Sequence, residues 1–389
     1  MIFLVTCDTG FESVLTEELT ELTNCSVKHV SSGRVFIEAP STRLIDILRS
    51  RIANNLYMLI CIRSDIAKLE DIYSAVRELD FTEFIDPTQS FAIRSERIGR
   101  HSFTSIDISR VAGQAVIDSY ISLRKTRLRV DLENPDVEIY IELNRDKLIV
   151  GLALFRTSMH VRRYRLFNHP VALKPTIAAS MLRLAGWRPT EGVIDPMCGG
   201  GTIVIEAALV SKGIEIPCIN KQNINVGVLR RVSQEVDRGL EKLCRKSTTE
   251  GDYHRAHIGI DINPRFVEGS AVNAKSAGVD DAAVFLVGDS LKLVPKVKQI
   301  EYEFGACINT AVFNPPYGYR MKPQRFKRLS ELYMGILNVL KDHSFRRVVF
   351  ITSATRVAER ALSSFRDIAV NRVRVVYGTL QSCVYIVNL

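Results

Sequence analysis

The first 155 residues alternate between strand-like and helix-like hydrophobic patterns. In residues 1–55, the strand-like runs IFLVTC and VSSGRVFIEA alternate with the helix-like runs FESVLTEELTEL and RLIDILRSRI, which predicts a small α+β module. Residues 56–155 predict a second one, with strands LYMLICIRS, SFAIRSER and RLRVDL and helices LEDIYSAVREL and SIDISRVAGQAVIDSYI. The runs VEIYIEL and KLIVGLAL, joined by Asn144-Arg145-Asp146, predict a closing hairpin.

The pattern changes after a basic linker at residues 156–190. In residues 191–389, the apolar runs GVIDPM, HIGIDI, AVFLVGD, ACINTAVFN and RRVVFIT alternate with helical segments. This alternation is typical of a parallel sheet with helices on both faces. The runs RVRVVYG and SCVYIVN around Gly378 predict an antiparallel pair on the edge of that sheet. We therefore predict an α/β chain with two small N-terminal modules and a larger C-terminal domain.

The positive charge of the chain is concentrated in its C-terminal part. The 389 residues carry a formal net charge of +9. Residues 1–155 contain 18 Lys and Arg against 23 Asp and Glu, a net charge of −5, which leaves +14 for the rest. Seven basic residues and no acid lie between Arg156 and Thr190, and five basic residues and no acid lie between Arg320 and Arg328. Such runs favour a polyanionic partner.

Composition also limits the cellular location and the role of the cysteines. No stretch approaches the roughly 20 apolar residues that a membrane span needs, and no signal sequence follows Met1. We therefore expect a cytoplasmic protein without a membrane partner, and a monomer. The eight cysteines are scattered singly with no CxxC spacing, so we expect small buried side chains rather than disulfides or a metal site.

A glycine-rich loop follows the first strand of the C-terminal domain. The segment Asp195-Pro196-Met197-Cys198-Gly199-Gly200-Gly201-Thr202 lies between a strand and the helical run TIVIEAALV. Glycines at the carboxyl end of a strand allow a tight turn and close approach of a ligand. The loop lacks the GxGxxG pattern, the next strand-end acid lies 66 residues on instead of ~20, and there is no Gly-Lys-Ser/Thr. These features disfavour a dinucleotide or a P-loop site, although a structural turn remains an alternative.

Acidic residues at successive strand ends suggest an adenosine ligand that bears an amino acid. We expect Asp195 near a methionyl amine, Asp261 at the two ribose hydroxyls and Asp289 beside the adenine, because carboxylates accept hydrogen bonds from amines and hydroxyls. They would repel a pyrophosphate. Singly, each acid could equally be a helix cap or a loop residue.

The motif Asn314-Pro315-Pro316-Tyr317 follows the apolar run AVF and is the candidate catalytic segment. Its prolines remove two backbone donors and stiffen the turn. The Asn314 side-chain oxygen and the Pro315 carbonyl can accept the two hydrogens of an exocyclic base amine, and Tyr317 offers a ring for stacking worth ~1–3 kcal/mol. The amine loses its proton during or after methyl transfer, so no strong general base is required. A rigid turn is the alternative for the motif alone.

Together, these motifs resemble those of the RNA guanine-N2 methyltransferases that carry a THUMP domain, which act on the tRNA acceptor region or on 23S ribosomal RNA. In the C-terminal half, the resemblance rests on LKPT (173–176), DPMCGGGT with Glu206, GIDINP and NPPYG. In the N-terminal half, it rests on SFAIRSERIGRHSFTSIDISRVAG and on Asn134-Pro135-Asp136. The chain departs from the family at Gly200, where serine is more common, and in an insertion at about residues 211–255.

The resemblance implies a ferredoxin-like module at residues 1–55, an RNA-gripping THUMP domain at 56–155 and a Rossmann-like methyltransferase domain with an antiparallel edge strand at 191–389. It also implies S-adenosylmethionine (SAM) as methyl donor. With the motifs, it predicts a set of cofactor-binding residues: Thr176, Asp195, Pro196, Cys198, Gly199, Gly201, Thr202, Asp261, Ile262, Asp289, Ser290 and Asn314. The basic runs and the THUMP-like segment predict RNA-binding residues: Arg94, Arg97, Arg100, Arg127, Arg162, Arg163, Arg165, Arg320, Lys322 and Arg325.

The function predicted from the sequence is therefore SAM-dependent N2-methylation of a guanosine in tRNA. Three alternatives remain open at this point. They are a ribosomal RNA guanine-N2 methyltransferase, an N6-adenine methyltransferase acting on RNA or DNA, and a noncatalytic RNA-binding protein with a vestigial methyltransferase fold. The motifs themselves do not separate guanine from adenine, because the same turn can hold either exocyclic amine.

Overall fold

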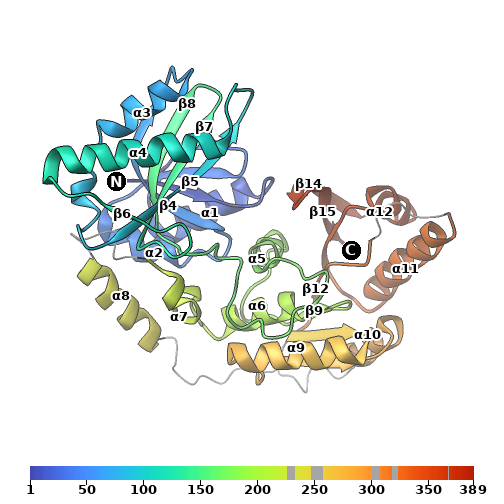
Figure 1. Ribbon diagram of the computed structural model, residues 1–389. Coiled ribbons are helices and arrows are strands. Elements are labelled where there is room, and N and C mark those ends of the chain that lie inside the picture. The colour runs from blue at the N-terminus through green and yellow to red at the C-terminus, as the bar shows by residue number, and fades with distance from the viewer. Residues whose placement is uncertain (226–232, 247–256, 300, 302–306, 318–322, 367) are drawn as a thin grey trace.

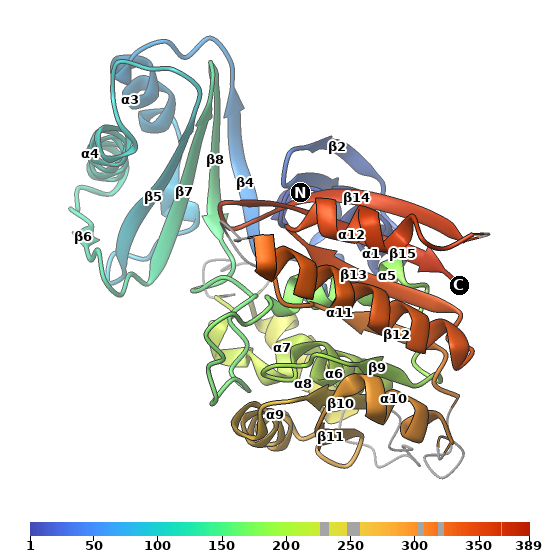
Figure 2. The ribbon, with the colours of Figure 1, turned by 90° about the vertical axis from the view of Figure 1, so that its right-hand side faces the viewer.

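Two β-sheets form the framework of the protein. The computed structural model describes residues 1–225, 233–246, 257–299, 301, 307–317, 323–366 and 368–389. An eight-stranded sheet lies in the N-terminal lobe and a seven-stranded sheet in the C-terminal lobe (Figure 1). Figure 2 shows the N-terminal strands and helix α1 beside strand β14 at the other end of the chain. Within the described residues, no helix is both long enough and apolar enough to cross a membrane.

The N-terminal sheet has the strand order β2-β3-β1-β4-β8-β7-β5-β6. Its strands are β1 (Ile2–Thr6), β2 (Val27–Ser31), β3 (Arg34–Glu38), β4 (Asn55–Arg63), β5 (Ser90–Ile98), β6 (Arg129–Val130), β7 (Val137–Asn144) and β8 (Lys147–Ala153). Its helices are α1 (Glu12–Thr23), α2 (Leu44–Leu48), α3 (Leu69–Arg77) and α4 (Ser105–Arg124). The predicted hairpin forms between β7 and β8, which pair antiparallel up to Asn144 and Lys147.

Strand β4 joins the two predicted N-terminal modules into one sheet. It pairs antiparallel with β1 on one side and with β8 on the other. The boundary expected near residue 55 therefore falls at the start of a strand that both modules share. The run VSSGRVFIEA, expected to be one strand, instead turns at Gly33 and forms the β2–β3 hairpin. Gly33 has a φ of 71°, a left-handed value that glycine adopts without strain.

The C-terminal sheet has the strand order β11-β10-β9-β12-β13-β15-β14. Its strands are β9 (Val193–Asp195), β10 (His257–Asp261), β11 (Ala283–Val287), β12 (Thr310–Phe313), β13 (Arg347–Thr352), β14 (Ala369–Tyr377) and β15 (Leu380–Asn388). Strands β9 to β13 are parallel, and β15 is antiparallel to both β13 and β14. The predicted Rossmann-like sheet with an antiparallel strand near its edge is confirmed.

Helices cover both faces of this sheet. On one face lie α5 (Pro175–Leu184), α6 (Thr202–Ser211) and α9 (Pro264–Ala277), and on the other lie α10 (Ser290–Gln299), α11 (Pro323–Asp342) and α12 (Thr355–Leu362). Helix α1 of the N-terminal lobe packs on α5, so one hydrophobic core continues from the N-terminal sheet into this face. The strand order reverses between β9 and β12, and a parallel sheet binds ligands beside such a reversal.

A disulfide in the insertion corrects the expectation for the cysteines. The insertion contains α7 (Ile216–Ile219) and α8 (Ser233–Lys246), and Cys218 is bonded to Cys244 with a Cα–Cα distance of 5.4 Å. Helix α8 also packs against α2 of the N-terminal module. The two cysteines are 26 positions apart, so no short spacing in the sequence indicated that they pair.

Candidate active site

The glycine loop turns tightly at the carboxyl end of β9. The backbone N–H of Met197 donates to the Asp195 carboxylate at 3.0 Å, and that of Gly201 donates to the Cys198 carbonyl at 2.9 Å. Gly201 has a φ of 77°, and a Cβ atom there would lie 2.9 Å from both Phe285 and Ser270. Only glycine therefore fits this position, from which helix α6 begins.

Two of the predicted acids meet at this loop. The Asp261 carboxylate, at the end of β10, accepts hydrogen bonds from the backbone N–H groups of Gly199 at 3.0 Å and of Asn263 at 2.9 Å. Asp195 is almost fully buried, and burial raises the pKa of its carboxyl to about 8, with a smaller contribution from the charge of Asp261. The site therefore holds a buried acid that can charge near neutral pH and an acid that fixes the loop.

A small cavity opens in front of the loop. Its lining includes five of the predicted site residues: Asp195, Cys198, Gly199, Thr202 and Asn314. The opposite wall comes from the linker, through His169, Val171, Ala172 and Leu173, which sequence reasoning did not assign to the site. The Leu173-Lys174-Pro175-Thr176 motif was a signal that this segment mattered, but it gave no indication of which side chains face the cavity.

Contacts from three directions hold this linker wall. The ring of His169 packs edge-on against Phe266 with a centroid distance of 4.2 Å. A guanidinium N–H of Arg165 donates to the carbonyl of Leu173, and the Tyr377 hydroxyl donates to the carbonyl of Ala172 at 2.7 Å. The wall is therefore fixed by Arg165 of the linker itself and by the C-terminal domain, including the last residue of β14.

The Asn-Pro-Pro-Tyr motif follows β12 and presents one unsatisfied acceptor. The side-chain oxygen Oδ1 of Asn314 is buried and has no hydrogen-bond partner among the described residues. Burial raises the pKa of the Tyr317 hydroxyl, and the side-chain NH2 group of Asn314, not its oxygen, opposes this rise as a hydrogen-bond donor. Because a buried acceptor without a partner is costly, Asn314 is suited to receive a donor from a ligand.

Tyr333, which the sequence did not single out, supports the turn from below. Its hydroxyl donates to the carbonyl of Pro316 at 3.3 Å and contacts the Thr352 hydroxyl at 2.9 Å. Tyr333 is buried on α11 among apolar side chains, where a tyrosine in a hydrophobic helix looks like an ordinary core residue. The role of Tyr333 is evident only in the fold, which brings the Asn-Pro-Pro-Tyr turn next to α11.

Thr176 does not reach the cavity, which corrects its assignment as a cofactor residue. It is buried at the start of α5, and its hydroxyl donates to the side-chain oxygen of Asn54 in the N-terminal module at 2.9 Å. The neighbouring Lys174 likewise forms an ion pair with Asp8 at 2.6 Å. Lys174 and Thr176 of the LKPT motif therefore bind the start of α5 to the N-terminal module.

Three other predicted cofactor residues, Ile262, Asp289 and Ser290, are outside the cavity lining but lie close to the glycine loop. Asp289 is exposed and caps α10 by accepting from the backbone N–H of Leu291 at 3.0 Å, while the Ser290 hydroxyl donates to the carbonyl of Pro196. Ile262, directly after Asp261, is 75% exposed. An exposed apolar side chain at a strand end offers a face for an adenine ring.

Two of the predicted RNA-binding arginines have internal roles. Arg162 is buried, forms an ion pair with Glu206 at 3.2 Å and donates to the backbone carbonyls of Met159 at 2.5 Å and Arg51 at 3.0 Å. Its assignment as an RNA contact is therefore wrong. Arg165 is half-buried and donates to the Thr202 hydroxyl at 2.7 Å as well as to the linker wall, so it also has an internal role.

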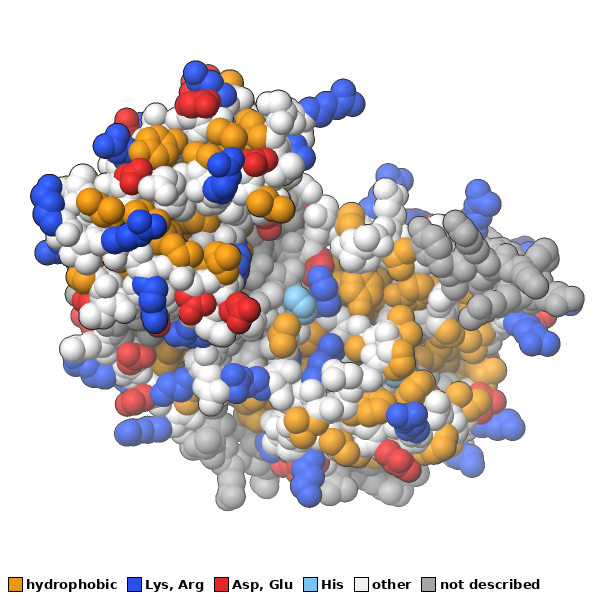
Figure 3. Space-filling model, in the orientation of Figure 1, with side chains coloured by type: hydrophobic (Ala, Val, Ile, Leu, Met, Phe, Trp, Pro, Cys, Tyr) orange, Lys and Arg blue, Asp and Glu red, His pale blue; other side chains and the backbone are white. Residues whose placement is uncertain are grey.

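The other predicted RNA-binding residues are exposed where the structure describes them. Arg97, Arg100, Arg127 and Arg163 lie on the surface, and Figure 3 shows Lys and Arg side chains spread over the N-terminal lobe beside a hollow between the lobes. Arg94 is exposed too, but it pairs with Glu138 at 3.2 Å. Arg320, Lys322 and the side chain of Arg325 lie outside the described residues.

The residues around the cavity fit SAM. The Asp195 carboxyl can accept from an ammonium group, the loop glycines let the backbone approach a ligand closely, and Ile262 can cover an adenine. The free oxygen of Asn314 lies in the same cavity and can accept from an amine. The arrangement can therefore bring a methyl donor and an amine together without a strong base.

Two family models match successive parts of the chain. The family described as "RMKL-like, methyltransferase domain" matches residues 162–383, and the THUMP domain family matches residues 67–153. A tRNA (guanine(6)-N2)-methyltransferase of Methanocaldococcus jannaschii is 34% identical over all of this chain and all of its own length. A protein of the same name from Archaeoglobus fulgidus is 37% identical over 92% of this chain and 85% of its own.

A solved structure supports the fold over almost the whole chain. The protein SMU.472, crystallised with SAH (S-adenosylhomocysteine), superimposes with a TM-score of 0.78 at 20% sequence identity. The match covers 99% of this chain and 97% of that chain. The fold of both lobes is therefore shared with this solved structure.

Proposed function

Because this chain belongs to the RMKL-like methyltransferases that carry a THUMP domain, we propose that it methylates the N2 amine of a guanosine in tRNA with SAM. The modified nucleotide would be the guanosine at position 6, the position named for the two curated relatives. The similarity to these relatives extends over 100% and 92% of this chain, respectively. It therefore favours RNA over DNA as the substrate.

One structural observation carries the proposal. The Asn314 Oδ1 atom is buried without a partner in the cavity that Asp195 and the glycine loop also line. A guanine N2 amine has two hydrogens, and Asn314 can accept one of them while the prolines keep the turn rigid. Holding the amine in this way directs its lone pair toward the donor, so orientation supplies most of the rate.

We assign each residue in or near the cavity to one part of SAM or of the guanine. SAM supplies an electrophilic methyl group on its sulfonium. Asp195 would accept from the methionyl ammonium, the Gly199–Gly201 turn would allow the close approach, and the exposed Ile262 would cover the adenine. Tyr317 gives the extruded guanine a ring to stack on, and Tyr333 keeps that turn in place through the Pro316 carbonyl. The proton of the amine leaves to water.

The experiment that tests the proposal combines two tRNA transcripts with labelled SAM. One transcript carries guanosine at position 6 and the other carries adenosine there, each with its pairing partner adjusted. We expect label only in the first transcript and, after nuclease digestion, only in N2-methylguanosine. Label in N6-methyladenosine, or label in ribosomal RNA transcripts but not in tRNA, would contradict the proposal.

An Asn314→Ala variant separates catalysis from binding. It should bind SAM and tRNA close to wild-type strength and lose turnover by about 100-fold or more, in the range seen when one transition-state contact is removed. An Asn371→Ala variant is the matched control, because Asn371 is exposed on β14 and does not line the cavity. If the wild-type protein has no methyl-transfer activity for the Asn314→Ala substitution to abolish, the protein is a noncatalytic RNA-binding protein.

We also propose that the enzyme acts as a cytoplasmic monomer, with one THUMP domain and one methyltransferase domain serving one tRNA. The support for this is that both domains lie in a single chain and that SAM and tRNA share the cytoplasm. Light scattering during size-exclusion chromatography, with and without tRNA, should give one protein per complex. A stable dimer would contradict this part of the proposal.

A further inference from the structure

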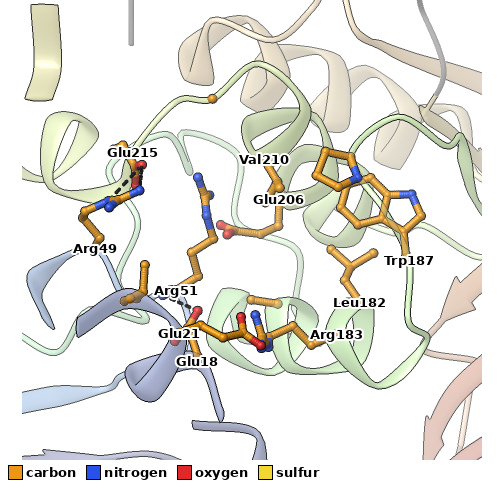
Figure 4. A pocket seen from close by; sticks show the side chains of 14 residues that line it. Glu18, Glu21, Arg49, Arg51, Leu182, Arg183, Trp187, Glu206, Val210 and Glu215 are labelled. Carbon is orange, nitrogen blue, oxygen red and sulfur yellow. Dashed lines mark hydrogen bonds and ion pairs between the residues drawn. The ribbon is translucent and has the colours of Figure 1, made fainter. Parts of the chain in front are cut away.

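A second cavity lies between the N-terminal module and the methyltransferase domain, apart from the residues that line the candidate active site. Its volume is about 320 Å³, at the lower end of the ~300–1,000 Å³ usual for small-molecule sites. Helix α1, the segment after α2, helix α5 and helix α6 all contribute to its lining. Figure 4 shows charged side chains from these elements pointing into one space.

Three charged groups in this cavity have polar atoms without a partner. Arg51 Nη1, Arg183 Nε and Glu206 Oε2 are buried, and none of these atoms has a hydrogen-bond partner among the described residues. Glu206 already accepts from Arg162 at 3.2 Å and from the Tyr164 hydroxyl at 2.9 Å through Oε1, so only its other oxygen lacks a partner. Each unsatisfied buried atom of this kind costs ~1–3 kcal/mol or more, and three around one cavity point to an occupant that supplies the missing bonds.

The other charges around the cavity are already satisfied. Glu18 accepts from the Ser50 hydroxyl at 2.5 Å and from the backbone N–H of Arg51 at 3.1 Å. Arg49 pairs with Glu215 at 2.8 Å. Arg183 pairs with Glu21 at 2.7 Å through a different nitrogen from the unpartnered Nε. The unmet demand is therefore confined to two guanidinium donors and one carboxylate acceptor.

This demand selects the charge of the occupant. An anion such as phosphate would satisfy Arg51 and Arg183, but it would lie against the carboxylate of Glu206. A cation such as a polyamine would satisfy Glu206, but it would lie against the two guanidinium groups. A molecule that carries one carboxylate and one ammonium meets both demands.

Several other residues of the lining are apolar, and they favour an apolar side chain on the bound molecule. Leu22, Ala179, Leu182 and Val210 contribute aliphatic surface, and Trp187 contributes a ring whose indole N–H is already donated to the Glu191 carbonyl at 2.9 Å. A ligand needs no further polar group to satisfy this apolar part of the lining. A short branched aliphatic side chain fits these surroundings.

We propose that this interlobe cavity is a second binding site that takes a small zwitterion, an α-amino acid with an aliphatic side chain. Its carboxylate would accept from Arg51 and Arg183, and its ammonium would donate to Glu206. The proposal goes beyond the methyltransferase function and does not depend on it. Its success or failure leaves the assignment of the active site unchanged.

The only tryptophan of the chain makes the site directly observable. Trp187 lines the cavity, so its fluorescence reports on the occupant without a label. We suggest titrating the full-length protein with L-leucine in the presence of saturating SAH, which blocks the methionyl part of the active site. The matched probes are 4-methylpentanoate, which lacks the amine, and 3-methylbutylamine, which lacks the carboxylate.

We expect L-leucine to change the emission of Trp187 in a saturable manner, with each single-charge probe binding at least about tenfold more weakly. The factor corresponds to the loss of one charge-assisted hydrogen bond. Absence of a leucine-dependent change would overturn the proposal and leave a cavity that holds only water. Equal binding of a single-charge probe would overturn it as well.

Variants that keep the fold give a second measurement. Arg183→Lys keeps the positive charge beside Glu21 but removes Nε, and Val210→Phe fills the cavity from α6; both should weaken leucine binding about tenfold or more. Arg188→Lys is the matched control, because Arg188 is exposed on the same segment and does not line the cavity. If all three variants bind leucine as wild type does, the ligand lies elsewhere and the proposal fails.

Discussion

The Tyr377 hydroxyl donates a 2.7 Å hydrogen bond to the carbonyl of Ala172, so the end of β14 holds the linker wall of the candidate active site. These residues are 205 positions apart. A hydroxyl that fixes a wall without entering the cavity should influence how firmly the cofactor is held. It should have little influence on the chemistry of the amine.

A Tyr377→Phe variant tests this relationship. Loss of one hydrogen bond worth ~0.5–1.5 kcal/mol should weaken SAM binding about two- to tenfold, measured by calorimetry, with turnover at saturating SAM nearly unchanged. Tyr73→Phe removes a comparable hydrogen bond to Asp118 in the N-terminal lobe and serves as the control. Equal SAM affinity in both variants would show that the bond to Ala172 does not position the wall.

Adjacent arginines should behave differently when they are substituted. Arg162 is buried in an ion pair with Glu206, whereas Arg163 is exposed. Arg162→Ala leaves a buried carboxylate without its partner and should lower the free energy of unfolding by ~3–5 kcal/mol, measured by denaturant titration. Arg163→Ala should leave stability within ~0.5 kcal/mol and weaken tRNA binding uniformly across tRNA sequences.

The salt dependence of tRNA binding separates these two roles further. Loss of a phosphate contact should reduce the slope of log affinity against log salt by about one for Arg163→Ala. The Arg162 variant, assayed where it is still folded, should keep the wild-type slope. A changed slope for Arg162 with unchanged stability would restore it to the RNA surface.

The raised pKa of Asp195 predicts a pH dependence of SAM binding. Burial raises this pKa from its ordinary value to about 8, so the carboxyl is mostly neutral at pH 6. A neutral acid attracts the methionyl ammonium weakly, and SAM affinity should therefore rise as the pH increases from 6 toward 8, by up to about tenfold per unit. Calorimetry at several pH values should show this rise in wild type and a nearly flat profile in Asp195→Asn.

The stability of the free protein should change with pH in the opposite direction. The folded state binds the Asp195 proton more tightly than the unfolded state, so this contribution is fully present below pH ~4 and is lost as the pH rises toward 8. Asp195→Asn should remove this part of the decline in melting temperature. If wild type and variant decline in parallel, Asp195 is already ionised at neutral pH in the folded protein.

The features that sequence reasoning identified depend on neighbouring residues. The glycine loop and the Asn-Pro-Pro-Tyr turn are each defined within about ten positions, and the strands around Gly378 within about twenty. The errors depended on distant partners. Arg162 and Arg163 are the same residue type in adjacent positions, and only Glu206, 44 residues away, shows that Arg162 is buried. Similarly, the Thr176 hydroxyl donates its hydrogen bond to Asn54, which lies 122 residues earlier in the chain. No local pattern carries that information.

The disulfide between Cys218 and Cys244 predicts a stability that depends on oxidation. Closing a loop of this length restricts the unfolded chain and should stabilise the fold by about 3 kcal/mol, so reduction or Cys218→Ser should lower the melting temperature by several degrees. Cys61→Ser, at a free half-buried cysteine, is the control, and reductant should still lower the stability of this variant. Alkylation of denatured, unreduced protein should modify the six free cysteines, and all eight only after reduction. Eight modified cysteines without reduction would show that the pair is not bonded, and α8 would then be held against α2 by packing alone.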